Sequence, residues 1–309
     1  MRVSALGFGC GATGGMIIAA DRATKLRAVA RAVDAGITYF DTAQAYGNGA
    51  SESGLGEVLA ALKPNVVVGS KVMLNLDEFS DIESAIVRAA EISLRRLQME
   101  RLDLFQLHNP IGITPAPGSN WIALSDLDAV SRAFERLRAQ GKIAHWGING
   151  LGETAALHQA VAICGAQTIQ ACFNLLNPSA GHGKPVEPTF QDYRGLIPAA
   201  ARAGVGVIAI RVLAGGALTD ADARHALASP SVDPIATHSS YDADVVLARH
   251  FRTWVDKGWA NTLAEAALRF AMFEPGVSSA LVGFSSLDQL EQAIAAAERG
   301  PLPGGLGWA

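Results

Sequence analysis

The chain has 309 residues, of which 50% are hydrophobic, and its formal net charge at pH 7 is −4. This length suits one large α/β domain or two smaller ones, and without a block of Lys or Arg a nucleic-acid partner is not expected. The three cysteines, Cys10, Cys164 and Cys172, are far apart and lack a C-x-x-C spacing. They argue against a disulfide framework or a metal site and fit a reducing cytoplasm. No apolar run approaches the ~18 residues of a membrane-spanning helix.

Eight segments of β type follow one another along the chain, with helical patterns between them. The predicted strands are residues 3–9, 37–40, 65–72, 102–108, 143–148, 168–173, 206–210 and 279–282. The β-branched run at residues 66–68 is typical of strands that are buried on both faces, as in a parallel sheet.

The helical patterns have their own start and stop signals. In residues 51–62 the apolar side chains share one face, and further helices are predicted at residues 243–257, 262–273 and 286–298. Gly36 stands where the C-terminal cap of a helix belongs. Ser80 and Glu83 have the spacing of a capping box.

The alternation of strands and helices predicts one α/β domain over residues 1–309. Eight βα units without a linker favour a closed (β/α)8 TIM barrel. The alternative is an open, doubly wound sheet. Against it, no G-x-G-x-x-G fingerprint opens a helix after the first strand, because Gly7, Gly9 and Gly11 lie in and just after that strand.

Three connections are longer than a compact domain usually needs. They are residues 111–124, which contain Trp121, residues 174–193, and a polar segment at residues 219–241. The first follows a strand that ends in His108, so we expect residues 111–124 to form part of a substrate mouth.

Three ionisable side chains end three consecutive predicted strands: Asp41, Lys71 and His108. Tyr46 stands on the loop after Asp41. The C-terminal ends of barrel strands meet at one face, where catalytic residues lie. Singly, each residue has a structural explanation: a buried lysine usually forms an ion pair, and a strand-end histidine usually satisfies hydrogen bonds. Their recurrence at three adjacent strands predicts a site.

The chemistry of this set depends on the tyrosine. A free tyrosine titrates near ~10 and is a poor acid or base at neutral pH, but a neighbouring ammonium group favours its phenolate form. Asp41 would keep Lys71 charged despite burial, so the pair is expected to tune proton transfer by Tyr46. His108 could orient a substrate oxygen. A tyrosine that protonates an oxygen suits carbonyl reduction with hydride from a cofactor.

The order and spacing of these residues resemble the aldo-keto reductase family over nearly the whole chain. The matching segments are Gly36-Ile37-Thr38-Tyr39-Phe40-Asp41-Thr42-Ala43, Tyr46-Gly47, Gly69-Ser70-Lys71 and Leu102-Asp103-Leu104-Phe105-Gln106-Leu107-His108. The resemblance implies a (β/α)8 barrel that binds an extended NAD(P)H without a Rossmann domain. It implies Tyr46 as general acid or base, Lys71 and Asp41 as its tuning pair, His108 as carbonyl orienter, and a monomer or dimer.

The resemblance also assigns cofactor contacts. Gln170 and Asn149 fall at the nicotinamide amide; Asn149 stands where the family usually has a serine, and Gly150 where it usually has an asparagine. The other assigned contacts are Gly9, Cys10 and Gly11 after the first strand, Arg211, Leu213 and Gly215 over the pyrophosphate, and Gly283, Ser285, Asp288 and Gln289 on the adenosine side.

The adenosine-side segment contains no Lys or Arg between Arg269 and Arg299. A 2′-phosphate normally needs cationic donors, whereas a carboxylate such as Asp288 can accept from a ribose 2′-hydroxyl. We therefore expect NAD ahead of NADP, unless Arg211 or an arginine of residues 219–241 folds over the phosphate. The alternative interpretation of Asp288 is a first-turn residue favoured by the helix dipole.

The leading interpretation is a nicotinamide-dependent oxidoreductase that acts on an aldehyde, ketone, sugar or alcohol. A second is a lyase or aldolase that uses Lys71 as a Schiff-base nucleophile, which Asp41 would hinder by keeping the lysine protonated. A third is a non-catalytic, nucleotide-sensing barrel, and the presence of all four catalytic positions speaks against it.

Overall fold

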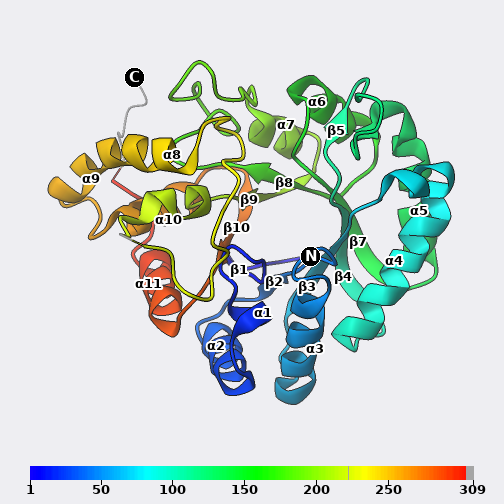
Figure 1. Cartoon of the computed structure of the whole chain (residues 1–309), viewed down its shortest axis with the longest axis horizontal. Helices are drawn as coiled ribbons and strands as arrows, with labels where there is room; N and C mark the ends of the chain where they lie inside the picture. Colours follow the sequence, from blue (N-terminus) through cyan, green and yellow to red (C-terminus); the bar gives the residue numbers. More distant parts are fainter. Residues whose placement is uncertain (222, 304–309) are drawn as a thin grey trace.

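Eight parallel strands close into a barrel in the computed structural model, which describes residues 1–221 and 223–303 (Figure 1). Their order around the barrel is β1, β10, β9, β8, β7, β4, β3 and β2. The strands are β1 (Leu6–Gly9), β2 (Tyr39–Asp41), β3 (Val67–Val72), β4 (Leu102–Leu107), β7 (Ile143–Asn149), β8 (Thr168–Cys172), β9 (Gly206–Ile210) and β10 (Val277–Gly283). The predicted barrel is confirmed, and the open-sheet alternative is wrong.

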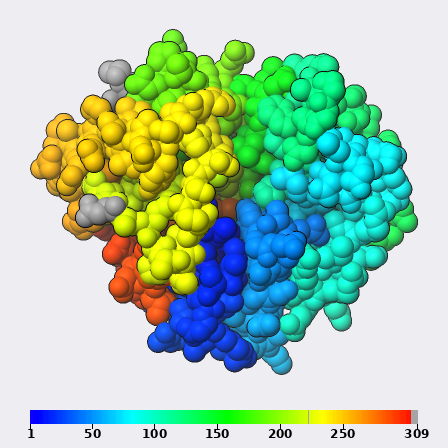
Figure 2. Space-filling view, in the orientation of Figure 1, coloured from blue at the N-terminus to red at the C-terminus, as the bar shows by residue number. Residues whose placement is uncertain are grey.

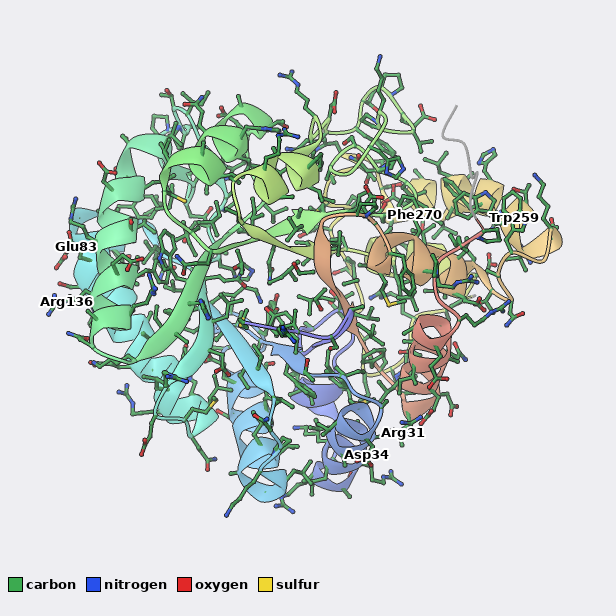
Figure 3. The ribbon with its side chains drawn as sticks, turned by 180° about the vertical axis from the view of Figure 1, so that it is seen from behind. Arg31, Asp34, Glu83, Arg136, Trp259 and Phe270 are labelled. Atoms are coloured by element: carbon green, nitrogen blue, oxygen red, sulfur yellow. The ribbon has the colours of Figure 1, made fainter. Side chains whose placement is uncertain are left out.

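Helices surround the barrel on its outer side (Figure 1). They are α1 (Met16–Ala19), α2 (Arg22–Asp34), α3 (Ala50–Leu62), α4 (Ile82–Leu97), α5 (Leu127–Ala139), α6 (Thr154–Ile163), α7 (Leu196–Arg202), α8 (Tyr241–Ala248), α9 (Arg252–Asp256), α10 (Leu263–Met272) and α11 (Leu287–Glu298). Short 3-10 turns are η1 (Leu76–Asp81), η2 (Leu124–Asp126), η3 (Ala214–Thr219) and η4 (Arg249–Phe251). Figure 3 shows the charged residues Arg31, Asp34, Glu83 and Arg136 on the outer rim of this ring.

The first strand is shorter than predicted because side-chain hydrogen bonds take the place of backbone pairing at its start. Ser4 N donates to Thr38 Oγ1 at 2.8 Å, and Thr38 N donates to Ser4 Oγ at 2.9 Å. These two bonds satisfy the backbone amides on both strands, so regular pairing of β1 begins only at Leu6.

Two helix signals have different outcomes. Gly36 follows α2 at φ 83°, as its predicted capping role requires. The capping box predicted at Ser80 is wrong: α4 starts one residue later, where the Asp81 carboxylate accepts from Ser84 N at 3.2 Å. The capping box that does form precedes η1, between Asn75 and Glu78.

Other helices depart from the sequence pattern. The helix predicted over residues 243–257 is divided into α8, η4 and α9. Helix α7 was not among the predicted elements. Pro198 is tolerated in it because the residue lies in the first turn, where no intrahelical donor is needed.

The connection at residues 111–124 folds away from the barrel mouth. It forms the two-stranded sheet of β5 (Ile111–Gly112) and β6 (Ile122–Ala123). Ile111 N donates to Leu151 O, and Glu153 N donates to Ile111 O, both at 2.9 Å. These bonds fix the connection against the segment between β7 and α6.

The polar segment at residues 219–241 instead crosses the mouth. In Figure 1 its yellow trace runs from η3 over the barrel towards β1, and in Figure 2 its atoms lie against the blue N-terminal residues. Ser229 N donates to Ala12 O at 2.8 Å. The Arg224 guanidinium donates to Ser229 O at 2.6 Å within the segment and to Gly215 O at 2.7 Å. Together, the bonds to Ala12 and Gly215 fix the segment to the loops after β1 and β9.

Side chains inside the barrel form layers because successive strand residues alternate between faces. Tyr39, Leu104 and Ile208 pack together as an apolar layer. Two residues further along their strands, Asp41 and Gln106 form a polar layer above it. Within the described residues, no helix is long and apolar enough to span a membrane.

Candidate active site

The ammonium group of Lys71 and the carboxylate of Asp41 form an ion pair inside the barrel, next to the C-terminal ends of β2 and β3. Both side chains are buried, at 1% and 4% exposure. Lys71 Nζ also donates to Thr42 O at 2.8 Å. Burial alone would lower the pKa of Lys71, but the charges of Asp41 and Tyr46 raise this pKa above its ordinary value. The lysine is therefore a cation in the folded protein.

Tyr46 lies directly beside this ion pair. Its hydroxyl oxygen is 3.4 Å from Lys71 Nζ, which is 4.8 Å from the centre of the tyrosine ring. The turn before α3 holds the tyrosine, since Tyr46 N donates to Ala43 O and Ser51 N donates to Tyr46 O. A Cβ atom at Gly11 would come within 3.3 Å of the ring, so a residue without a side chain leaves room there.

His108 follows β4 and faces Tyr46. The two rings are 5.8 Å apart and nearly perpendicular, with an interplanar angle of 83°. Burial and the positive charge of Lys71 lower the pKa of His108 to about 3, so the imidazole is neutral at physiological pH. Its Nδ1 is buried without a hydrogen-bond partner among the residues described. Its backbone oxygen accepts from Asn149 Nδ2 at 2.7 Å.

A buried polar network supports Asp41 from below and from the side. The Tyr39 hydroxyl donates to Asp41 Oδ2 at 2.7 Å, and Gln170 Nε2 donates to the same oxygen at 2.8 Å. Gln170 Nε2 also contacts Gln106 Oε1 at 3.1 Å, and Gln106 Nε2 donates to Thr168 Oγ1 at 3.1 Å. Sequence reasoning missed Tyr39 and Gln106, although strand alternation places Tyr39 on the same face as Asp41.

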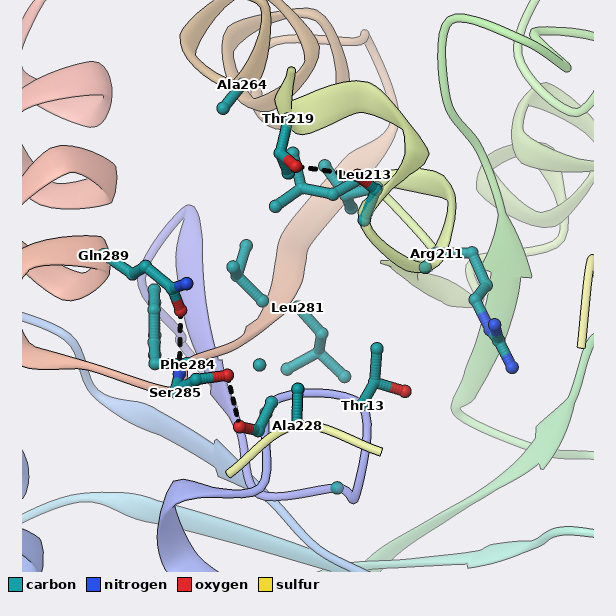
Figure 4. A pocket seen from close by; sticks show the side chains of 18 of the residues that line it. Thr13, Arg211, Leu213, Thr219, Ala228, Ala264, Leu281, Phe284, Ser285 and Gln289 are labelled. Atoms are coloured by element: carbon teal, nitrogen blue, oxygen red, sulfur yellow. Dashed lines mark hydrogen bonds between the residues drawn. The ribbon is translucent and has the colours of Figure 1, made fainter. Parts of the chain in front are cut away.

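A cavity of about 860 Å³ opens at this face and extends from Tyr46 and His108 to the start of α11. Its volume falls in the ~300–1,000 Å³ range of small-molecule sites. Figure 4 shows part of its lining, with Gln289 and Ser285 at one end and Arg211 at the other. The predicted cofactor residues that line it are Gly9, Gly11, Asn149, Gln170, Arg211, Leu213, Gly215, Gly283, Ser285, Asp288 and Gln289.

Cys10 is not among the residues that line this cavity, unlike its neighbours Gly9 and Gly11. The residue is 1% exposed and packs in the core, and burial raises the pKa of its thiol far above the ordinary value. Its backbone contributes instead: Cys10 N donates to Asp41 O at 2.8 Å, and Ser51 Oγ donates to Cys10 O at 2.8 Å. These bonds join the β1 loop to β2 and α3.

The mouth of the cavity differs from the one predicted. The lining includes no residue of 111–124; that loop is held against β7 and α6 as described above. The segment at residues 219–241 supplies the wall in its place, with Arg224, Val232, Asp233, Ile235 and Tyr241. A polar segment without periodicity gives no sequence signal for this position, because long-range contacts with the β1 and β9 loops set it.

The far end of the cavity, beside α11, is already hydrogen-bonded internally. Ser285 Oγ donates to Gly14 O at 2.6 Å, and Ser285 N donates to Gln289 Oε1 at 2.8 Å (Figure 4). Asp288 is exposed in the first turn of α11. Glu291 turns away from the cavity and pairs with Arg31 on α2 at 2.6 Å.

Two observations near the catalytic end test whether a nicotinamide fits. Asn149 Oδ1 is buried and lacks a hydrogen-bond partner within the described residues, so this cavity-lining amide has an acceptor to offer. Gly150 cannot carry the asparagine that the family usually has there, because a Cβ atom would lie 2.2 Å from Gln170 O. The unpartnered oxygen of Asn149 can accept from an amide such as that of a nicotinamide, so the residues present fit this group.

The structure thus combines a closed (β/α)8 barrel with a long cavity that is lined at one end by Asp41, Tyr46 and His108. The sequence model of the Aldo/keto reductase family matches residues 5–304. The chain belongs to this family and is an NAD(P)-dependent oxidoreductase of the kind that acts on carbonyl compounds.

Individual relatives agree on the family and differ in their substrates. Methylglyoxal reductase YeaE of Escherichia coli is 33% identical over 133 residues, which cover 43% of this chain and 41% of the relative. L-galactose dehydrogenase of Arabidopsis thaliana is 27% identical over 306 residues, or 96% of this chain and 85% of the relative. An aldo/keto reductase of Klebsiella pneumoniae, solved with NADP and acetate, is 27% identical at TM-score 0.67, covering 98% of this chain and 88% of that one.

Proposed function

We propose that Tyr46 is the general acid that protonates a carbonyl oxygen in reduction, and the general base for the hydroxyl group in oxidation. The observation that carries the proposal is the 3.4 Å approach of the Tyr46 hydroxyl to Lys71 Nζ inside the cavity. A bound nicotinamide dinucleotide supplies or accepts the hydride. The protein's own residues supply the proton and hold the reacting oxygen.

Lys71 places a fixed ammonium group 3.4 Å from the Tyr46 hydroxyl, where it can stabilise the negative charge that develops on the phenol oxygen in the transition state of proton transfer. Asp41 keeps the ammonium charged, and Tyr39 and Gln170 saturate Asp41 Oδ2. Neutral His108 lies across from Tyr46, so a carbonyl oxygen between the two rings would meet Tyr46 on one side and the imidazole on the other. His108 would then orient the oxygen without competing as an acid.

The cofactor residues follow from the position of this acid. Hydride transfer requires the nicotinamide to lie next to Tyr46, where Asn149 and Gln170 would bind its carboxamide. The adenosine would then lie at the other end of the cavity, beside α11. Gly9, Gly11, Leu213 and Gly215 would border the dinucleotide between them. The residues at the adenosine end would be Gly283, Ser285, Asp288 and Gln289, where the N-terminus of α11 offers free backbone N–H groups.

NAD is proposed as the preferred dinucleotide, with NADP as the alternative. The described arginines lining the cavity are Arg211, Arg224 and Arg299. Arg299 pairs with Glu265 at 3.0 Å, Arg224 donates to backbone carbonyls, and Arg211 lies at the opposite end from Gln289 (Figure 4). The adenosine end therefore offers the carboxylate of Asp288 and no unpaired guanidinium among these three, an arrangement that suits a 2′-hydroxyl group.

The Schiff-base alternative gains no support from the site. A nucleophilic lysine must lose its proton, yet the Lys71 pKa is raised and the ammonium is held by Asp41 and the Thr42 carbonyl.

The Tyr46→Phe variant tests the proposed function. It removes the acidic hydroxyl and keeps the ring, so turnover of carbonyl substrates with NADH or NADPH should fall by ~10²–10⁴-fold. Dinucleotide affinity, measured by fluorescence quenching, and the melting temperature should stay near the wild-type values. Turnover close to wild type in this variant would remove Tyr46 from the mechanism. The test begins with a screen of aldehydes, ketones, sugars and alcohols with both dinucleotides.

A further inference from the structure

Arg211 occupies the cavity at a position that an anionic group of the substrate can reach. The residue directly follows β9 and lines the same cavity as Tyr46 and His108. In Figure 4 its side chain extends away from Leu213, and it lies across the drawn cavity from Ser285 and Gln289. The guanidinium is therefore at the end opposite the adenosine site.

The backbone of Arg211 is held in a conformation that arginine rarely adopts. Its φ is 57°, in the left-handed region. Two hydrogen bonds maintain this conformation: Asn174 Nδ2 donates to Arg211 O at 2.9 Å, and Ala214 N donates to the same oxygen at 2.8 Å. Left-handed non-glycine residues that neighbouring groups hold in place occur frequently at ligand sites. The held backbone fixes the direction of the Cα–Cβ bond of Arg211, and the hydrogen bond from its Nη1 to Asp233 O positions the guanidinium.

The guanidinium also lacks a charge partner. Its Nη1 donates to the backbone oxygen of Asp233 at 3.0 Å. Within residues 1–221 and 223–303 it forms no ion pair with a carboxylate, although it is only partly exposed. A guanidinium has five N–H donors in a planar fork, and a carboxylate matches that fork in a bidentate geometry. Most of the fork is thus available to an anion in the cavity.

We propose that Arg211 binds a carboxylate group of the substrate, so that the enzyme prefers carbonyl compounds that carry a carboxylate over neutral ones. This inference rests on the proposed function, because it places the reacting carbonyl between Tyr46 and His108. The sequence prediction gave Arg211 to the pyrophosphate of the cofactor. Its place on the wall of the cavity that Tyr46 and His108 also line favours the substrate. The guanidinium also lies close to Gly215, where a Cβ atom would be 3.4 Å from Arg211 Nη1, so the experiment is designed to separate these two anions.

The test compares a four-carbon aldehyde that carries a terminal carboxylate with its methyl ester, in the wild-type protein and the Arg211→Met variant. We expect the ratio of kcat/KM for the acid over that for the ester to fall at least tenfold in Arg211→Met. Arg211→Lys should recover part of the ratio, because it restores the charge without the fork. Arg202→Met, which removes an exposed arginine at the end of α7, should leave the ratio unchanged.

Binding measurements provide a second readout that needs no turnover. Succinate should bind to the wild-type protein with NADH present, measured by calorimetry, and at least tenfold more weakly to Arg211→Met. Equal losses for the acid and the ester, or a tenfold loss of dinucleotide affinity with an unchanged ratio, would overturn the proposal and return Arg211 to the pyrophosphate. If the wild-type protein reduces neither substrate, the proposed function fails for this class, and the succinate comparison still decides whether Arg211 holds a carboxylate.

Discussion

The Tyr39 hydroxyl donates its hydrogen to Asp41 Oδ2 at 2.7 Å, from the position two residues earlier on the same strand. The other carboxylate oxygen of Asp41, Oδ1, forms the ion pair with Lys71 Nζ. Asp41 is therefore held from both sides inside the barrel by hydrogen-bond donors, one of which is a cation. Because Asp41 keeps Lys71 protonated, Tyr39 acts on the site indirectly, as a positioning residue behind the proposed acid.

Replacing Tyr39 by Phe should weaken both the fold and the reaction. The change removes a hydrogen bond to a buried carboxylate, for which a loss of ~1–3 kcal/mol in the free energy of unfolding is expected. The pH profile of kcat should also move, since a less stabilised Asp41 holds Lys71 less firmly. The measurements are urea denaturation and kcat between pH 5 and 10. Tyr193→Phe, at a buried tyrosine outside this network, is the control; a stability loss with an unshifted pH profile would leave Tyr39 a purely structural residue.

Lys71→Met leaves the Asp41 carboxylate buried without its charge partner. Both side chains are almost completely buried, so we expect a loss of ~3–5 kcal/mol in the free energy of unfolding at pH 7. Turnover should be lost with it. The double variant Lys71→Met/Asp41→Asn removes the uncompensated charge and should recover much of the stability, but not the turnover. A single variant that unfolds at the wild-type urea concentration would show that the pair contributes little.

The histidine gives a prediction for pH. The pKa of His108 is about 3 in the folded protein and near ~6.5 in an unfolded chain. Below pH ~6.5 the imidazole is therefore protonated in the unfolded chain but stays neutral in the folded protein. The free energy of unfolding consequently decreases through His108 as the pH falls from about 6.5 towards 3. Above pH 6.5 this residue adds no pH dependence.

The His108→Gln variant isolates this effect. The difference between its free energy of unfolding and that of the wild-type protein should change between pH 6.5 and pH 4.5, in favour of the variant at the lower pH, and stay constant from pH 7 to 9. Urea denaturation at four pH values measures it. A difference that is flat across the whole range would mean that His108 protonates in the folded protein as readily as in the unfolded chain.

The elements with a strong local pattern could be read from the sequence, and those set by distant contacts could not. Eight strands, and the polar residues Asp41, Lys71 and His108 at or next to the ends of three of them, follow from short apolar runs that are interrupted by polar residues. The position of residues 219–241 depends on hydrogen bonds such as Ser229 N to Ala12 O, which no local pattern encodes. Gln170 lines the cavity as expected, and its amide nitrogen also donates to Asp41, a contact with another strand that no local pattern encodes.

The cofactor preference gives the last prediction. Wild-type protein should bind NADH more tightly than NADPH, because Asp288 stands at the proposed adenosine end, while Arg299, which also lines the cavity, is paired with Glu265. Asp288→Arg should shift the ratio of the two dissociation constants towards NADPH by at least tenfold, or ~1.4 kcal/mol. The side chain is exposed, so the fold should tolerate the change, apart from ~0.3–1 kcal/mol for a cation at the N-terminus of α11.

The matched control is Glu298→Arg, which makes the same charge change at the exposed far end of α11. For each variant, fluorescence quenching measures the dissociation constants of NADH and of NADPH, each at 20 mM and at 200 mM salt. The gain for NADPH in Asp288→Arg should shrink at the higher salt concentration, since a surface charge pair is screened. Tighter binding of NADPH than of NADH by the wild-type protein would contradict the preference and identify Arg224 or Arg299, released from its present partners, as the ligand of the 2′-phosphate.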